Sequence, residues 1–144
     1  MILYLDTSAL VSLFVRESGS LRTRAAAGRS TRVATSFLAY PEMLAALARR
    51  LRIGEIPEAA SERAQRAFDS AWPSWIHVRL DRRLLPEIRR ILKVHPLAGA
   101  DAVHLASALL LARHFAGSEI PLVFACSDRT LETAARADGL ACDF

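Results

Sequence analysis

The sequence has few cysteines and no long apolar run. The first absence argues against a zinc site, and the second against a membrane-spanning helix. Within its 144 residues no apolar run approaches the roughly 20 residues that a membrane-spanning helix needs. The first residues carry no basic stretch of the kind that opens a signal peptide, and Asp6 interrupts their apolar run. We therefore expect a cytoplasmic protein with no membrane segment.

The chain holds two cysteines, Cys126 and Cys142. They lack the spacing of a zinc motif, and two thiols alone do not make a zinc site. Both fall in segments that we expect to be strands near the end of the chain. We predict that they are buried and reduced.

Lysine is nearly absent: Lys93 is the only one, so the formal net charge of +4 comes from arginine. Arginine binds phosphate through two parallel hydrogen bonds, although a GC-rich genome produces the same bias. Arginine doublets at residues 49–50, 82–83 and 89–90 fit either solvated helix faces or a surface that tracks RNA phosphates. No aromatic pattern predicts base stacking on a sheet.

Strand-like and helix-like patterns alternate along the chain. We predict strands at residues 2–5, 33–35, 75–80, 120–125 and 140–144, and helices at residues 7–15, 21–29, 57–70, 98–115 and 128–137. Two further helices, capped by Ser36 and Asp81, should reach Ile53 and Val94. This alternation predicts one α/β domain over residues 1–144, with a central parallel sheet of four to five strands flanked by helices.

Four acidic residues lie where a helix starts or a strand ends: Asp6, Glu42, Asp101 and Asp128. An unpaired carboxylate in an apolar stretch is costly to desolvate. Because ligands bind at the carboxyl ends of parallel strands, the four acids can converge on one edge of the sheet. Oxygen donors without a Cys or His set suit Mg²⁺ or Mn²⁺, ions that activate water in phosphodiester hydrolysis.

Each of these acids also has a simpler interpretation. Asp6, Asp101 and Asp128 suit the first turn of a helix, where capping and the helix dipole stabilise a carboxylate. Glu42 is harder to explain in this way, because Pro41 disturbs the helix beside it and the surrounding residues are apolar.

Several other residues have a chemical and a structural interpretation. Ser8 and Ser127 are candidates to hold metal-bound water or a phosphate oxygen, or else only cap the backbone. His104 follows Asp101 by one helical turn. We favour a histidine that packs in the helix and bonds locally, with a general base as the alternative. The apolar faces of the helices ending at Ile53 and near residue 70 fit core packing or a partner interface.

Four segments together resemble a known family: residues 4–10 (Tyr-Leu-Asp-Thr-Ser-Ala-Leu), 36–42, 100–106, and 127–131 with 134–140. They are similar to the acidic motifs of PIN-domain proteins, most closely the VapC-type ribonuclease toxins of bacterial toxin–antitoxin pairs. The resemblance covers essentially the whole chain, and the segment around Asp101 is the most specific. One departure is Cys126, where family members often carry Thr or Ser.

The resemblance implies an endoribonuclease that depends on Mg²⁺, with Mn²⁺ as a substitute. It implies that Asp6, Glu42, Asp101 and Asp128 are catalytic metal ligands. Ser8 and Ser127 would support them, and the fourth acid is the least secure ligand because of Cys126. The family also implies a homodimer that a cognate antitoxin inhibits. It does not identify which RNA is cleaved.

Three other proteins fit parts of the sequence. A non-catalytic receiver-type module needs an acidic pair near its first strand and a lysine after a late strand, but Asp6 has no acidic neighbour and Lys93 falls in a helix. A HAD-type phosphatase needs a second Asp where this chain has Ser8. A degenerate PIN domain that serves only as a protein-interaction scaffold is the third, and retention of all four acids argues against it.

Overall fold

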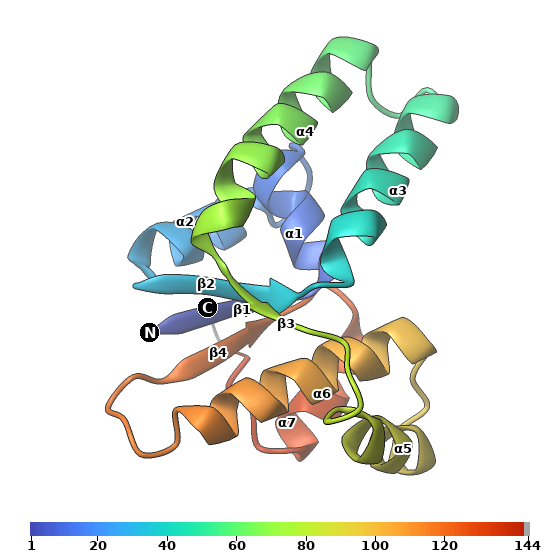
Figure 1. Cartoon of the computed structure of the whole chain (residues 1–144). Helices are drawn as coiled ribbons and strands as arrows, with labels where there is room; N and C mark the ends of the chain where they lie inside the picture. The colour runs from blue at the N-terminus through green and yellow to red at the C-terminus, as the bar shows by residue number, and fades with distance from the viewer. Residues whose placement is uncertain (143–144) are drawn as a thin grey trace.

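The computed structural model describes residues 1–142, which form a four-stranded parallel sheet with helices on both faces (Figure 1). The strands are β1 (Ile2–Leu5), β2 (Arg32–Ser36), β3 (Ile76–Val78) and β4 (Leu122–Ala125), in the order β3-β2-β1-β4. All pairings are parallel. This confirms the predicted α/β class and the predicted number of strands.

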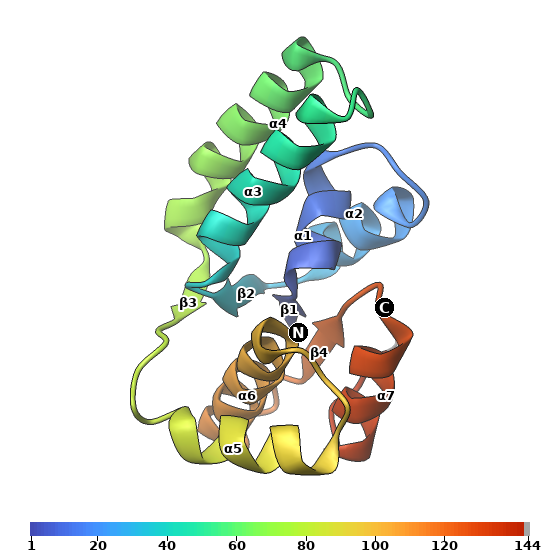
Figure 2. The same ribbon diagram turned by 90° about the vertical axis from the view of Figure 1, so that its right-hand side faces the viewer.

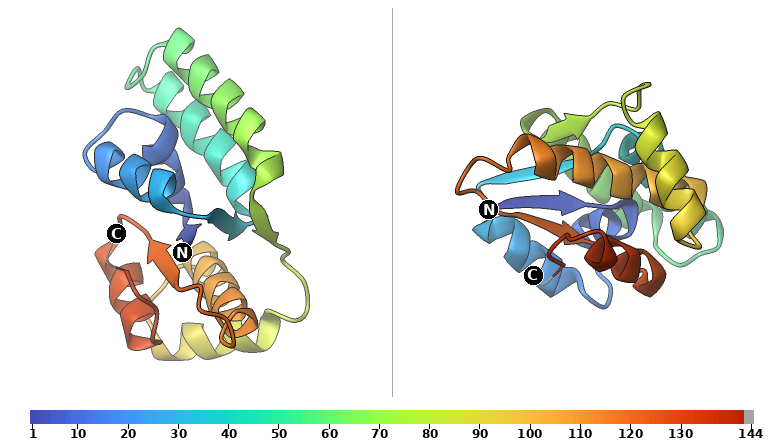
Figure 3. Two further views of the ribbon diagram at one scale, coloured as in Figure 1. Left: turned by 90° about the vertical axis from the view of Figure 1, so that its left-hand side faces the viewer. Right: turned by 90° about the horizontal axis from the view of Figure 1, so that it is seen from below.

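The helices form two layers, one on each side of the sheet. The upper layer in Figures 1 and 2 comprises α1 (Thr7–Phe14), α2 (Ser20–Arg29), α3 (Ala39–Arg52) and α4 (Glu58–Ala71). The lower layer comprises α5 (Leu85–Val94), α6 (Gly99–His114) and α7 (Arg129–Ala137), which Figure 3 shows from below. A short 3₁₀ turn, Trp72–Ser74, leads from α4 into β3.

Strand β1 lies between the two layers, and all four of its residues are buried. Its side chains alternate between two apolar cores: Leu3 and Leu5 face α1, α3 and α4, while Ile2 and Tyr4 face α6 and α7. A strand covered on both faces reads as a continuous apolar run, which is why residues 2–5 were recognisable.

Two helices begin later than predicted. Helix α3 starts at Ala39, and the Ser36 hydroxyl accepts a hydrogen bond from the Leu38 amide at the end of β2, so Ser36 is not its N-cap. Helix α5 starts at Leu85, and Asp81 pairs with Arg83 in the preceding turn. Pro86 stands in the first turn of α5, the only part of a helix that accepts proline readily.

The edge strands are shorter than predicted. The third strand covers only Ile76–Val78, and the predicted strand at 140–144 is reduced to one bridge between Val123 and Ala141. Residues 143–144 of that strand lie outside the described residues. Cys142 is buried as predicted, but Cys126 is only half-buried and follows β4. Cys126 is a free thiol.

Within residues 1–142, no single helix is long and apolar enough to cross a membrane. Helices α5 and α6 reach the required length and composition only as a pair, and this pair is bent by 120° at the break between them.

An aromatic cluster joins the α3–α4 pair to the rest of the upper layer. Phe68 is fully buried at its centre, with the rings of Phe14, Tyr40, Trp72 and Trp75 at centroid distances between 5.3 and 6.2 Å. This packing fixes the orientation of α3, the helix that carries Glu42.

We expect Phe68→Ala to lower the free energy of unfolding by about 3–5 kcal/mol, since it leaves a cavity among rings that cannot collapse. Urea denaturation measures the loss. Leu21→Ala is the control: Leu21 is 83% exposed, so its substitution should change stability by less than about 0.5 kcal/mol. Equal stability of the two variants would contradict the role given to the cluster.

Candidate active site

All four acids predicted from the sequence line one cleft of about 500 Å³. Each comes from a different element: Asp6 caps α1 directly after β1, Glu42 and Asp101 lie in the first turns of α3 and α6, and Asp128 caps α7 after β4. The cleft lies at the carboxyl ends of β1 and β4, where the strand order reverses. The capping interpretation and the site interpretation are therefore compatible.

Asp6 is the most buried of the four, at 5% exposed. Its Oδ1 accepts hydrogen bonds from the Ala9 amide at 2.8 Å and the Ser8 hydroxyl at 2.7 Å. Burial nevertheless raises the pKa of Asp6 to about 6, against the lowering effect of these hydrogen bonds. A nearby cation would stabilise the ionised form of a carboxylate in this environment.

Ser8 connects the start of α1 to the loop that carries Asp128. Its Oγ donates to Asp6 and accepts a hydrogen bond from the backbone amide of Ser127 at 2.8 Å. The Asp128 Oδ1 accepts the amide of Leu131 at 2.8 Å. The sequence prediction singled out both serines for their hydroxyls, whereas the contact that Ser127 makes with Ser8 uses its backbone.

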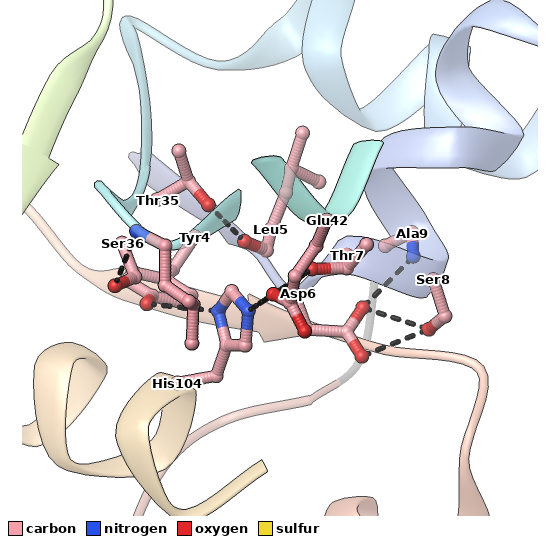
Figure 4. A network of polar contacts seen from close by, with 11 residues as sticks. Tyr4, Leu5, Asp6, Thr7, Ser8, Ala9, Thr35, Ser36, Glu42 and His104 are labelled. Atoms are coloured by element: carbon pink, nitrogen blue, oxygen red, sulfur yellow. Dashed lines mark hydrogen bonds and ion pairs between the residues drawn. The ribbon is translucent and has the colours of Figure 1, made fainter. Parts of the chain in front are cut away.

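Glu42 is held from the side of α1 and α6 (Figure 4). The Thr7 hydroxyl donates to Oε2 of Glu42 at 2.5 Å, and Nε2 of His104 lies 2.8 Å from the same oxygen. Partial burial favours a higher pKa for Glu42, but the hydrogen bonds from His104 and Thr7 outweigh it and lower the pKa. Glu42 is therefore ionised at neutral pH.

His104 and Thr7 are the contacts that sequence reasoning missed. His104 is 2% exposed and bonds to residues of β1, α1 and α3, not locally within α6 as favoured from the sequence. Thr7 appeared in the sequence only as one residue of the segment 4–10, with no role assigned to it. The one signal for both was their position beside acids: Thr7 follows Asp6, and His104 lies one turn after Asp101.

The carboxylates of Asp101 and Asp128 carry like charges and repel each other. Burial raises the pKa of Asp101, and the negative charge of Asp128 raises it further. The thiol of Cys126 is half-buried near the carboxylates of Asp6 and Asp128, and burial raises the pKa of this thiol. Cys126 therefore stays protonated at neutral pH and does not add an anionic donor.

The donor chemistry of the cleft suits a hard divalent cation. Among residues 1–142, no three Asp, Glu, His or Cys side chains are arranged so that they already enclose an ion. The four predicted acids and the hydroxyls of Ser8 and Ser127 are oxygen donors of the kind that Mg²⁺ and Mn²⁺ prefer. Two further carboxylates that line the cleft, Glu17 and Glu55, pair with Arg50. Burial and the negative charge of neighbouring carboxylates raise the pKa of Asp6 and of Asp101, and a positive ion between the acids would stabilise the ionised forms.

One arginine doublet borders the cleft. Arg49 and Arg50 both line it, and Arg50 pairs with Glu17 at 2.7 Å. Arg49 is exposed and makes no ion pair within the part of the chain that the structure describes. The doublets at 82–83 and 89–90 do not line the cleft.

Comparison with known proteins identifies the family. The sequence model of the PIN domain matches residues 3–116. The chain belongs to the PIN-domain family. Two Mycobacterium tuberculosis proteins, Ribonuclease VapC45 (strain CDC 1551 / Oshkosh) and Ribonuclease VapC49 (strain ATCC 25618 / H37Rv), are each 37% identical to it over 138 residues, covering 96% of this chain and 92% of theirs. Within the PIN-domain family the chain is therefore of the VapC type.

Solved structures share the PIN fold of this chain at low sequence identity. FitAcB from Neisseria gonorrhoeae aligns with a TM-score of 0.69 and 18% identity, covering 100% of this chain and 97% of that one. FitAB bound to an IR36 DNA fragment gives 0.67 and 20%, with coverage of 99% and 93%. PAE2754 from Pyrobaculum aerophilum gives 0.60 and 22%, with coverage of 93% and 84%.

Proposed function

We propose that this PIN-domain protein is a Mg²⁺-dependent endoribonuclease, with Mn²⁺ as a substitute, and the toxin of a cytoplasmic toxin–antitoxin pair. The observation that carries the proposal is the convergence of four acids, from four separate elements, on one cleft. Support also comes from the VapC-type relatives, which are named as ribonucleases.

In this proposal Asp6, Glu42, Asp101 and Asp128 hold the divalent cation. When bound, the cation supplies an activated water and stabilises the negative charge that develops on the phosphodiester. The chain's own residues orient the ligands: Ser8 and the Ala9 amide fix Asp6, and Thr7 and His104 fix Glu42. Ser8 and Ser127 support the cleft beside Asp128.

Cleavage of total RNA tests the proposed function. The wild type, incubated with and without Mn²⁺, should produce defined new ends only with the ion, and Asp101→Asn should produce none. Mapping these ends would also identify the RNA. Wild-type cleavage by Asp101→Asn would refute the carboxylate site. A wild type that neither cleaves RNA nor responds to Mn²⁺ would favour the degenerate PIN scaffold.

We expect Arg49 to contact the RNA backbone, because it lines the cleft and is not paired with an acid within residues 1–142. In the Asp101→Asn background, Arg49→Gln should weaken RNA binding and reduce the slope of log K against log salt by about one. Fluorescence anisotropy at several salt concentrations measures both. The control is Arg52→Gln, at an exposed residue of the same helix that does not line the cleft. Equal slopes for the two variants would contradict the contact.

We also propose a homodimer and a cognate antitoxin. Apolar side chains remain exposed at the end of α3, where Leu51 is 38% and Ile53 63% exposed. A groove of about 640 Å³ runs beside α4, with Phe14, Ile56 and Ala60 among its lining. Light scattering on the purified protein tests the dimer, and a monomeric mass at micromolar concentration would refute it.

A further inference from the structure

Glu42 is held by only one of its two carboxylate oxygens. Oε2 accepts the hydrogen bond from Thr7 at 2.5 Å and lies 2.8 Å from Nε2 of His104. Oε1 accepts no hydrogen bond from any side chain or amide of residues 1–142. Because Glu42 lines the cleft, this asymmetry leaves Oε1 as the oxygen available to a ligand.

The imidazole of His104 is itself fixed from the opposite side. Its Nδ1 lies 3.3 Å from the hydroxyl of Tyr4, which is fully buried on β1 and stacks on Phe124 with ring centroids 5.5 Å apart. The phenolic O–H of Tyr4 is a hydrogen-bond donor and can donate to Nδ1. The tautomer that satisfies both contacts carries its hydrogen on Nε2 and donates it to Glu42.

We propose that His104 is a positioning residue that acts through Glu42, an inference that rests on the proposed function. The chain of contacts runs from Tyr4 on the central strand, through the imidazole, to Oε2 of Glu42 (Figure 4). This chain of contacts fixes Oε1 of Glu42 relative to Asp6, the residue that directly follows β1. His104 touches no substrate in this scheme.

The competing explanation is that His104 serves only as a structural contact between α6 and the sheet. Loss of a purely structural contact lowers the free energy of unfolding, whereas loss of a positioning contact lowers the affinity for the cation. Groups that orient a metal ligand typically contribute 10- to 100-fold to metal affinity. Metal affinity, measured without RNA, therefore separates the two explanations.

The first test is calorimetric titration of Mn²⁺ into His104→Leu and His104→Gln. We expect about a 10- to 100-fold loss of affinity for His104→Leu. His104→Gln places an amide N–H near the former Nε2 and should recover most of the loss. Wild-type affinity in His104→Leu, or an equal loss in both variants, would overturn the positioning role.

A double-mutant cycle tests whether His104 acts through Glu42. In a Glu42→Gln background, His104→Leu should cause no further loss of Mn²⁺ affinity, while in an Asp128→Asn background its full loss should persist. A full additional loss in the Glu42→Gln background would refute the mechanism. If Glu42→Gln binds too weakly to titrate, the rescue by His104→Gln decides.

Thr7→Val provides a second variant, which keeps the imidazole of His104 but removes the contact of its Nε2 with the Thr7 hydroxyl. It removes the other donor to Oε2 and should also lower Mn²⁺ affinity, so the proposal remains testable if His104→Leu fails to fold. Wild-type affinity in Thr7→Val would count against it. A wild type that binds no Mn²⁺ and cleaves no RNA refutes the proposed function instead; wild-type binding and cleavage with an unaffected His104→Leu refutes only the inference.

Discussion

Asp6→Asn is expected to abolish RNA cleavage and, at the same time, to make the metal-free protein more stable. Loss of a ligand removes several kcal/mol of charge stabilisation in the transition state, and about 4 kcal/mol corresponds to a thousand-fold lower rate. We therefore expect cleavage to fall by about a thousand-fold or more. Quantitative cleavage of a defined RNA in Mn²⁺ measures the loss.

The gain in stability follows from the buried charge. Asp6 has a pKa of about 6 in the folded protein, above its ordinary value of 3.8. At neutral pH the fold therefore contains an ionised group that burial disfavours. Asparagine removes that charge and keeps an oxygen for the Ala9 amide, so the free energy of unfolding should rise by up to about 3 kcal/mol.

Thermal unfolding in EDTA at pH 7.5 measures this gain, which corresponds to a rise of several degrees in Tm. Glu119→Gln, at an exposed loop residue, is the matched control and should leave Tm unchanged. The combination matters, because a variant that is inactive through misfolding would be less stable, not more. Cleavage at the wild-type rate, or a lower Tm in EDTA, would contradict the role given to Asp6.

Mn²⁺ should stabilise the wild type strongly at pH 7.5 and weakly at pH 5. At one hundred times its dissociation constant a ligand adds about 2.7 kcal/mol to the free energy of unfolding, which is about 5–10 °C in Tm for a chain of this size. The ion needs ionised ligands. At pH 5 Asp6 is mostly protonated, since its pKa is about 6, and the pKa of Asp101 is raised as well.

The metal-free protein should show the opposite trend. A carboxyl group whose pKa is raised on folding adds stability below its ordinary pKa, and that contribution is lost as pH rises from about 4 to 6. The gap between the Tm in Mn²⁺ and the Tm in EDTA should therefore widen as pH rises. Thermal scans between pH 5 and 8 measure it, with Asp101→Asn as the control. A gap that is independent of pH, or equal in the control, would contradict the prediction.

The sequence contained enough to predict the framework of the site. The buried run Ile2–Leu5 identified the central strand, and the alternation of patterns identified the parallel sheet. In such a sheet the carboxyl ends of the strands share one edge, so acids at strand-to-helix junctions converge without any knowledge of side-chain contacts. Asp6 and Asp128 were predictable for this reason.

The errors arose where local pattern competes with neighbouring structure. Asp81 and Ser36 suit helix caps, but each bonds to a residue two positions on and forms a turn before the helix. Strand β3 is short because it pairs only with β2 at the edge of the sheet. A short strand at an edge leaves few periodic residues to identify its ends.

The contacts around Glu42 lay beyond sequence reasoning for a different reason. Thr7 and Glu42 are 35 positions apart, and Glu42 and His104 are 62 apart. Their meeting depends on the angle at which α3 leaves the sheet and on the depth of α6 below it. No local period encodes either quantity, so a buried histidine appeared as ordinary helix packing.

The central claim is that four carboxylates from four elements hold one kind of cation. Calorimetric titration of Mn²⁺ into the wild type and into Asp6→Asn, Glu42→Gln, Asp101→Asn and Asp128→Asn tests it most directly. We expect saturable binding by the wild type and a loss of at least about tenfold in affinity for each variant. Absence of binding by the wild type, or wild-type affinity in all four variants, would contradict it.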